Sequence, residues 1–314
     1  MSRFFVAPED VGAEYITIEN KEDLHHMNKV LRLKAGDEID VSDGDMWEYH
    51  GKILSLEPEC CQVEILDKQK FSAEPETKIT LFQGIPKQGK MELIVQKAVE
   101  LGACGIVPVF MDRTVVTDKG NFGKKIQRGQ KVSNEAVKQC KRGIIPQIEN
   151  AIKMPEVIRR FAGFDLVLFP YENEDGTTIK EVLRPLAGGS DDEASTAAGN
   201  AGKSARPENI AIIIGPEGGF SEKEAQQIVE AGGKSVSLGK TTLRTETAGL
   251  AAIAMTLYEL ELCRKLEWYK QELNNGKNKK CTFAGDIHFF FVPVRNFAIR
   301  YYADSLPYAC LFLF

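Results

Sequence analysis

From residue 78 onward, short apolar segments alternate with helical ones, and this alternation restricts the fold more than any other feature of the chain. The apolar, β-rich segments are residues 79–82, 106–110, 166–169, 210–214 and 236–238. Between them, residues 91–101 carry apolar side chains at helical spacing, and residues 124–141 are expected to form the next helix. Strands that alternate with helices predict a parallel α/β sheet. The unbroken apolar run 211–214 indicates a strand that is covered on both faces.

The first 72 residues have a different pattern and predict a small β-barrel. Five short β-rich segments are expected at residues 3–6, 15–18, 38–41, 52–56 and 62–66. Asp43-Gly44 is a hairpin signal, and residues 22–33 show the apolar spacing of one helix. We therefore expect a β-barrel domain over 1–72, a linker over 71–77 and an α/β domain over 78–273.

Two segments depart from this organisation. Residues 188–205 have almost no apolar side chain beyond alanine and predict a flexible surface insertion. Residues 274–314 form an atypical tail, in which ten of the last 34 residues are Phe or Tyr without a helical or strand period. Exposed, such a tail would favour aggregation, and no function follows from its composition.

Composition excludes several classes of protein. The 314 residues are 43% hydrophobic and 27% charged, as in ordinary soluble proteins. Seven cysteines without a Cys-x-x-Cys pair argue against both a disulfide framework and a zinc site, so we expect no metal. The chain lacks an apolar run long enough for a membrane helix and has no signal-peptide core at its start. We expect a cytoplasmic protein with no membrane partner.

A glycine-rich loop follows the buried strand, at residues 215–219. The carboxyl ends of strands in an open α/β sheet are where ligands bind. Pro216 would stiffen this turn, while Gly218 and Gly219 would permit positive φ and a close approach of the backbone to a ligand. Glu217 would either stand beside that ligand or cap a neighbouring backbone segment. The loop lacks the spacing of a phosphate-binding loop.

A second loop, residues 238–247, leads from a strand into another helix. Thr245 is the expected N-cap of that helix, and Glu246 would favour its first turn. One interpretation is capping with a surface ion pair. The other is a ligand held by backbone amides, with Arg244 or Glu246 facing a substrate.

Charge is concentrated in residues 119–142. This segment contains eight Lys or Arg residues and one acidic residue, Glu135, so its net charge is +7 within a chain whose net charge is −5. A run of charge usually marks a solvated helix face, but such a one-sided bias in an acidic protein favours a surface for a polyanion.

Six segments together resemble the bacterial 16S ribosomal RNA (uracil-N3)-methyltransferase family, RsmE, of the SPOUT class. They are residues 3–6, 25–34 with 36–38, 87–102, 135–142, 215–219 and 243–247, and the resemblance covers about residues 2–262. It implies a PUA-like barrel followed by an α/β methyltransferase domain with a C-terminal trefoil knot. It also implies S-adenosylmethionine as cofactor, 16S rRNA or the small ribosomal subunit as partner, and a homodimer.

The resemblance assigns roles to individual residues. Cofactor contacts are expected from Leu168, Pro170, Ile214, Gly215, Pro216, Glu217, Gly218, Gly219, Leu238, Gly239, Leu243 and Thr245. RNA contacts are expected from Arg3, Lys29, Arg32, Arg113, Lys138 and Arg142. The expected catalytic residues are Arg244 and Glu246.

Methylation of uracil N3 requires an in-line methyl donor, a route for the N3 proton and stabilisation of the developing uracilate. Arg244 suits the stabilisation, and Glu246 is either the base or a structural partner of Arg244. The target uridine must be unpaired or flipped, because N3 lies on its Watson–Crick edge.

Three departures from the family accompany the resemblance: Thr241 where a basic residue is usual, Lys138 where an acid is common, and the aromatic tail.

Two other functions remain open. One is methylation of another RNA position, such as a ribose 2′-oxygen, and the other is RNA binding without catalysis in ribosome assembly.

Overall fold

A computed structural model describes residues 3–45, 47–70, 74–87, 89–117, 122–174, 176–187, 206–262, 281–283 and 287–289. The chain divides into two units, residues 1–262 and 263–314. The predicted insertion 188–205 and most of the predicted tail lie outside the described residues. In the second unit, β13 (Cys281–Phe283) pairs antiparallel with β14 (Ile287–Phe289).

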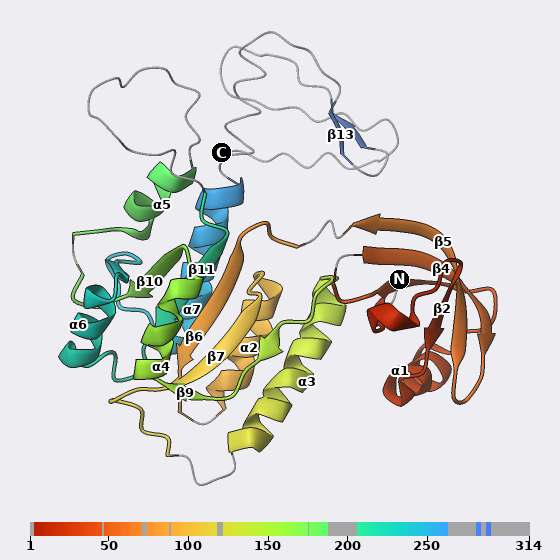
Figure 1. The fold of residues 1–314 in the computed structure, drawn as a ribbon, viewed down its shortest axis with the longest axis horizontal. Helices are drawn as coiled ribbons and strands as arrows, with labels where there is room; N and C mark the ends of the chain where they lie inside the picture. The colour runs from red at the N-terminus through yellow and green to blue at the C-terminus, as the bar shows by residue number, and fades with distance from the viewer. Residues whose placement is uncertain are drawn as a thin grey trace. The chain divides into compact units, whose positions relative to one another are not determined.

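The N-terminal domain is a five-stranded β structure with short helical segments (Figure 1). Its strands are β1 (Arg3–Phe5), β2 (Tyr15–Ile18), β3 (Glu38–Ser42), β4 (Trp47–Leu56) and β5 (Cys61–Lys70), in the order β1-β3-β4-β5-β2. Its helical segments are η1 (Pro8–Asp10), α1 (Lys21–His25) and the π-helical η2 (His26–Leu31). All five predicted strands are confirmed. The strands β4 and β5 are longer than predicted because they pair with each other along their whole length in an antiparallel hairpin.

The predicted hairpin turn joins β3 to β4. These strands are antiparallel, and Gly44 has a φ of +71°, which a glycine adopts without strain. Beyond the turn, His50 on β4 contacts two carboxylates of β3: its Nδ1 lies 3.2 Å from Asp40 Oδ1 and its Nε2 lies 3.1 Å from Glu38 Oε2. Alternate side chains of the strands, such as Ile39, point into the barrel core.

The second domain is built on a seven-stranded sheet in which every pair is parallel, which confirms the predicted α/β class. Its strands are β6 (Lys78–Gly84), β7 (Gly105–Phe110), β8 (Gln147–Ile148), β9 (Ile152–Lys153), β10 (Leu166–Pro170), β11 (Asn209–Ile214) and β12 (Lys234–Val236). The order is β12-β10-β11-β6-β7-β8, and β9 also pairs with β7. The trefoil knot stays a prediction.

Helices cover both faces of this sheet (Figure 1). They are α2 (Lys90–Glu100), α3 (Phe122–Cys140), α4 (Met154–Arg159), α5 (Ile179–Ala187), α6 (Glu222–Glu230) and α7 (Thr245–Leu257), with η3 (Arg160–Gly163) and η4 (Tyr258–Leu262). The short β8, β9 and α4, and α5 with its internal Pro185, were not predicted.

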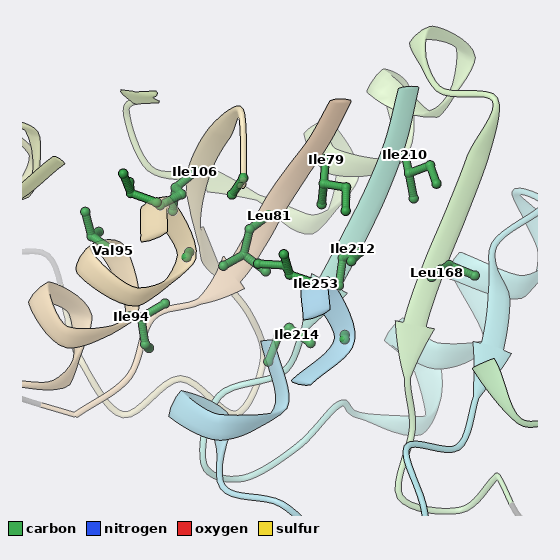
Figure 2. Close-up of a cluster of buried hydrophobic side chains, with 14 of the residues drawn as sticks. Ile79, Leu81, Ile94, Val95, Ile106, Leu168, Ile210, Ile212, Ile214 and Ile253 are labelled. Carbon is green, nitrogen blue, oxygen red and sulfur yellow. The ribbon is translucent and has the colours of Figure 1, made fainter. Parts of the chain in front are cut away.

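The sheet is buried on both sides, as the apolar run 211–214 predicts. Ile212 and Ile214 pack with Leu81 of β6 on the face that carries α2 and α7 (Figure 2). Ala211 and Ile213, which alternate with them, pack on the opposite face against α4 and α6. Burying each Ile or Leu side chain contributes about 1.5–3 kcal/mol, so the sheet is a rigid support for the loops at its edge.

The end of α3 contacts the barrel and the segment between the two domains. Lys138 on α3 forms an ion pair of 2.7 Å with Asp23 of α1, and the Ser42 hydroxyl donates a hydrogen bond of 2.6 Å to the Gly143 carbonyl. Glu74 lies before β6 and accepts hydrogen bonds from Arg142 and from the backbone amides of Gly143 and Ile144. Side chains from both domains therefore fix the loop after α3.

Candidate active site

An open cavity of about 610 Å³ lies at the carboxyl ends of β10, β11 and β12. This volume is within the range of small-molecule sites. Eleven of the predicted site residues line it, namely Pro170, Ile214, Gly215, Pro216, Glu217, Gly219, Leu238, Gly239, Leu243, Arg244 and Thr245. The two loops that the sequence singled out therefore form one cavity.

Three of the predicted site residues do not line the cavity. Leu168 is fully buried in the core beneath the sheet, because it lies in the middle of β10. Gly218 is on the outer side of its loop, where its carbonyl accepts a hydrogen bond of 2.9 Å from Arg113 Nη1. Glu246 is in the first turn of α7 and contacts a residue that does line the cavity, Lys90.

The glycine loop is folded tightly on itself. Gly219 has a φ of +69°, whereas no positive φ is found at Gly218, so only one of the two predicted positions needs this freedom. A Cβ on Gly215 would lie 3.2 Å from the Gly219 Cα, which is closer than ordinary contact. The Glu217 carboxylate accepts a hydrogen bond of 2.9 Å from the Lys87 amide, so it caps a neighbouring backbone segment while also lining the cavity.

A buried chain of hydrogen bonds connects the two loops to the sheet. Gln83 Nε2 at the end of β6 donates to Thr245 Oγ1 over 2.9 Å, and Thr245 Oγ1 donates to the Gly215 carbonyl over 2.6 Å. The prediction that Thr245 is the N-cap of α7 was wrong. Arg244 occupies that position without a side-chain cap, and the Thr245 hydroxyl is used to hold the other loop. Neither the spacing nor the composition of the sequence indicated this partner.

The two predicted catalytic residues have different surroundings. Arg244 is exposed, and no residue of the described chain forms an ion pair with it. Glu246 Oε2 lies 3.0 Å from Lys90 Nζ, and the same ammonium lies 3.5 Å from Glu217 Oε1. Burial would raise the pKa of the Glu246 carboxyl, but its own backbone amide and the Lys90 ammonium bring that pKa below its ordinary value. Glu246 is therefore ionised at neutral pH.

Several cavity residues were not predicted. They are Lys87, Lys90, Tyr171, Glu172, Glu174, Phe220, Val236, Ser237, Lys240, Thr241, Thr242 and Ala248. Lys87 and Lys90 stand in one of the family-like segments, which was the signal available in the sequence. Lys240, Thr241 and Thr242 lie within the second loop, between residues that were predicted.

Four of the six predicted RNA-binding cations have partners within the protein, and three of these four are arginines. Arg142 is only 4% exposed, and its guanidinium donates to Glu74 and to the carbonyls of Val99 and Ala103. Arg3 pairs with Glu48 and donates to the Lys141 carbonyl. Arg113 donates to the glycine loop, as described above. The burial of Arg142 is at odds with a role in RNA contact, because its charge is already compensated inside the protein.

The other three predicted cations lie at the surface. Lys29 and Arg32 are exposed on and just after η2, and Arg32 ends that segment in the left-handed region with a φ of +54°. Lys138 is partly exposed but shares its charge with Asp23. On α3, Lys124 and Lys131 add exposed charge of the same sign.

Within the described residues, no helix has the length and apolar character required to span a bilayer.

Comparison with known proteins defines the class. Residues 73–257 match the family described as "RNA methyltransferase domain", and residues 18–66 match the one described as "RNA methyltransferase PUA domain". The chain is an RNA methyltransferase with a PUA domain. The PUA match falls on the barrel, and the methyltransferase match contains every residue that lines the cavity.

Relatives narrow this class. "Ribosomal RNA small subunit methyltransferase E" of Bacillus subtilis is 30% identical over 248 residues, which are 77% of this chain and 90% of that protein. The protein of the same name from Mesomycoplasma hyopneumoniae is 30% identical over 250 residues, 80% of this chain and 96% of the relative. The chain belongs to the ribosomal RNA small subunit methyltransferase E family.

Solved structures agree with this assignment. The structure of a ribosomal RNA small subunit methyltransferase E from Neisseria gonorrhoeae, bound to S-adenosyl methionine, has a TM-score of 0.62 and 30% identity, and the match covers 81% of this chain and 96% of that one. A putative methyltransferase from Legionella pneumophila, in complex with the bound cofactor SAM, has a TM-score of 0.65 and 28% identity over 82% of this chain and 96% of that one. The predicted family and fold class are thus confirmed.

Proposed function

We propose that this protein transfers the methyl group of S-adenosylmethionine to N3 of a uridine in 16S rRNA of the small ribosomal subunit. The observation that carries the proposal is the cavity between the glycine loop and the 238–245 loop, in a chain of the ribosomal RNA small subunit methyltransferase E family. Its working compartment is the cytoplasm, where bacterial ribosomal subunits are found.

The residues of the cavity fit S-adenosylmethionine. Pro170, Ile214 and Leu238 would supply apolar walls for an adenine ring, and the backbone of Gly219 would border the ligand directly because this residue has no side chain. Glu172 supplies a carboxylate that can accept hydrogen bonds from ribose hydroxyls or pair with a cationic group. When bound, the cofactor supplies an electrophilic methyl group on a sulfonium.

Arg244 and Glu246 supply the remaining chemistry. The Arg244 guanidinium can donate hydrogen bonds to the uracil carbonyl oxygens and stabilise the negative charge that develops as N3 loses its proton. The ionised Glu246 carboxylate can accept that proton. A carboxylate is a much weaker base than the N3 anion of uracil, so the N3 proton is expected to leave as the N–C bond forms rather than before.

The RNA surface is formed by exposed cations on both domains. Lys29 and Arg32 belong to the barrel, and Lys131 belongs to α3. The ion pair between Lys138 and Asp23 holds α3 against α1, so these cations lie on connected elements. Their charge is suited to phosphate contacts, which repay the cost of unpairing the target uridine.

The active form is a homodimer. Met255 near the end of α7 and Tyr258 at the start of η4 are 39% and 51% exposed in the described chain, and both are apolar side chains at the far end of the helix that begins at the site. A second copy that covers these side chains would pack on the C-terminal end of α7, the helix whose N-terminal end carries Arg244. Light scattering of the purified protein tests this part of the proposal, and a monomer at the concentrations used for activity would contradict it.

The reaction itself is tested by mass spectrometry of nucleosides. The protein is incubated with S-adenosylmethionine and unmodified small ribosomal subunits, and in a parallel reaction with the naked 16S rRNA. We expect new 3-methyluridine. A ribose-methylated nucleoside would contradict the assigned position, and the absence of any product despite cofactor binding in calorimetry would favour RNA binding without catalysis.

A further inference from the structure

Lys90 connects three segments of the chain at the edge of the cavity. Its ammonium lies 3.0 Å from Glu246 Oε2 in the first turn of α7 and 3.5 Å from Glu217 Oε1 on the glycine loop. All three side chains are partly shielded, with exposures of 29% for Lys90, 16% for Glu246 and 22% for Glu217. An ammonium that serves two carboxylates beside a ligand cavity is unlike the exposed pairs elsewhere on the surface, which contribute little.

The position of Lys90 is fixed by a rigid element. It is the first residue of α2, directly after Gly89, which has a φ of +89°. The same helix buries Ile94 and Val95 in the core shown in Figure 2, and it packs against α7, which carries Glu246. The packing of α2 on the sheet therefore fixes the backbone of Lys90, and the two carboxylates hold its ammonium.

The groups that face Glu246 determine how it behaves as a proton acceptor. They are Lys90 from α2, Arg244 at the start of α7, and Glu217 on the far side of the Lys90 ammonium. The nearest cation in direct contact is Lys90. Arg244 acts over a longer distance and makes no ion pair with Glu246 among the described residues, so it remains available for a substrate.

We propose that Lys90 is a positioning residue for methyl transfer, which orients the Glu246 carboxylate toward the reacting base and ties it to the glycine loop through Glu217. This inference rests on the proposed function and deepens it. It also explains why Glu246 and Arg244, two residues apart, do not pair with each other. Glu246 pairs with Lys90 and accepts the proton, whereas Arg244 stays available for the uracil carbonyl oxygens.

Methyl transfer to N3 exchanges one bond at the methyl carbon and needs an acceptor for the N3 proton. The bond between the cofactor sulfur and its methyl carbon breaks, the uracil N3–carbon bond forms, and the N3 proton passes to a Glu246 oxygen. Lys90 stays protonated throughout, and its attraction for Glu246 weakens once that carboxyl is neutral. The released proton then leaves to solvent when product and cofactor dissociate.

The test compares Lys90→Met with Lys97→Met. Lys97 is a matched control because it lies on the same helix and forms an ion pair of 2.8 Å with Glu100, away from the cavity. Formation of 3-methyluridine is measured at saturating RNA and cofactor over a range of pH, and cofactor affinity is measured by calorimetry. Thermal unfolding of both variants shows whether they fold.

For Lys90→Met we expect kcat to fall by roughly ten- to a hundredfold, since misplacing a reacting group by about 1 Å has such an effect. Cofactor affinity should change by no more than a few-fold. Because Lys90 favours the ionised form of Glu246, its removal should move the acid limb of the kcat profile to higher pH, and Lys90→Arg should restore that limb. Lys97→Met should behave as the unaltered protein.

Two results would overturn the inference. One is a Lys90→Met protein with the same kcat and acid limb as Lys97→Met. The other is a loss of cofactor affinity as large as the loss of kcat, which would make Lys90 part of the cofactor site. If instead the unaltered protein forms no 3-methyluridine, the proposed function fails, and the role of Lys90 in methyl transfer fails with it.

Discussion

Replacing Thr245 with Val tests whether the buried chain of hydrogen bonds holds the two cavity loops together. The Thr245 hydroxyl is the only link between Gln83 on β6 and the Gly215 carbonyl in the hydrogen bonds of the described chain. Thr245 is 6% exposed and Gln83 is fully buried, so water cannot readily replace the lost partner. Valine has nearly the same shape as threonine but lacks the hydroxyl, so the substitution removes the two hydrogen bonds with little change in packing.

The expected magnitude follows from the lost contacts. An unsatisfied Gly215 carbonyl costs about 1–3 kcal/mol, and the hydrogen bond from Gln83 adds about 1 kcal/mol. The new methyl group recovers about 0.8 kcal/mol. We therefore expect Thr245→Val to lower the free energy of unfolding by about 1–3 kcal/mol. The affinity for S-adenosylmethionine should fall as well, because the glycine loop loses its tether.

Urea unfolding and calorimetry measure both effects. Thr245→Ser keeps the hydroxyl and should retain most of the stability and affinity. Thr247→Val changes an exposed threonine in the same turn and should have little effect. The reasoning is refuted if the Val and Ser variants at position 245 have the same unfolding free energy and the same cofactor affinity.

Two further predictions concern the barrel and the catalytic residues. The hydrogen bond to Asp40 raises the pKa of His50 above its ordinary value of about 6.5, and burial opposes this shift only in part. The protonated His50 should therefore stabilise the fold fully below about pH 6.5, and this stabilisation should be lost as the pH rises through the raised pKa. The stability advantage over His50→Gln should therefore shrink as the pH rises above about 6.5 in urea unfolding, and an advantage that grows with pH would contradict it. Arg244→Ala should lower turnover strongly while leaving cofactor affinity within a few-fold, because Arg244 is exposed and free to meet the base. Equal losses of turnover and affinity, measured by nucleoside mass spectrometry and calorimetry, would place Arg244 in the cofactor site instead.

The sequence predicted those features that depend on local pattern. The Ser-x-x-Glu pattern at Ser221 and Glu224 predicts a capping box, and the two residues form one at the start of α6, with the Ser221 hydroxyl accepting a hydrogen bond from the Glu224 amide. Runs such as 211–214 have the burial that their composition indicates. The two loops of the cavity could be located because each follows a strand of one parallel sheet, and strands of such a sheet end at the same edge.

Features that depend on distant partners could not be predicted. A charge run does not reveal which cation is buried, and Arg142 differs from its neighbours only because the turn after α3 brings it to Val99 and Ala103. Lys90 and Glu246 are 156 residues apart in the chain. The short α4 and β9 were missed because two to six residues give too little periodicity to recognise.

The contact between Glu74 and Arg142 has a consequence for how the two domains can be separated. A fragment that begins at residue 78, where the strand pattern starts, would lack the carboxylate that neutralises a guanidinium enclosed by the methyltransferase domain. An unpaired buried charge of this kind costs about 3–5 kcal/mol, a large part of the stability of an ordinary domain. The connecting segment is thus a structural component of the catalytic half, and an independently folding piece has to include Glu74.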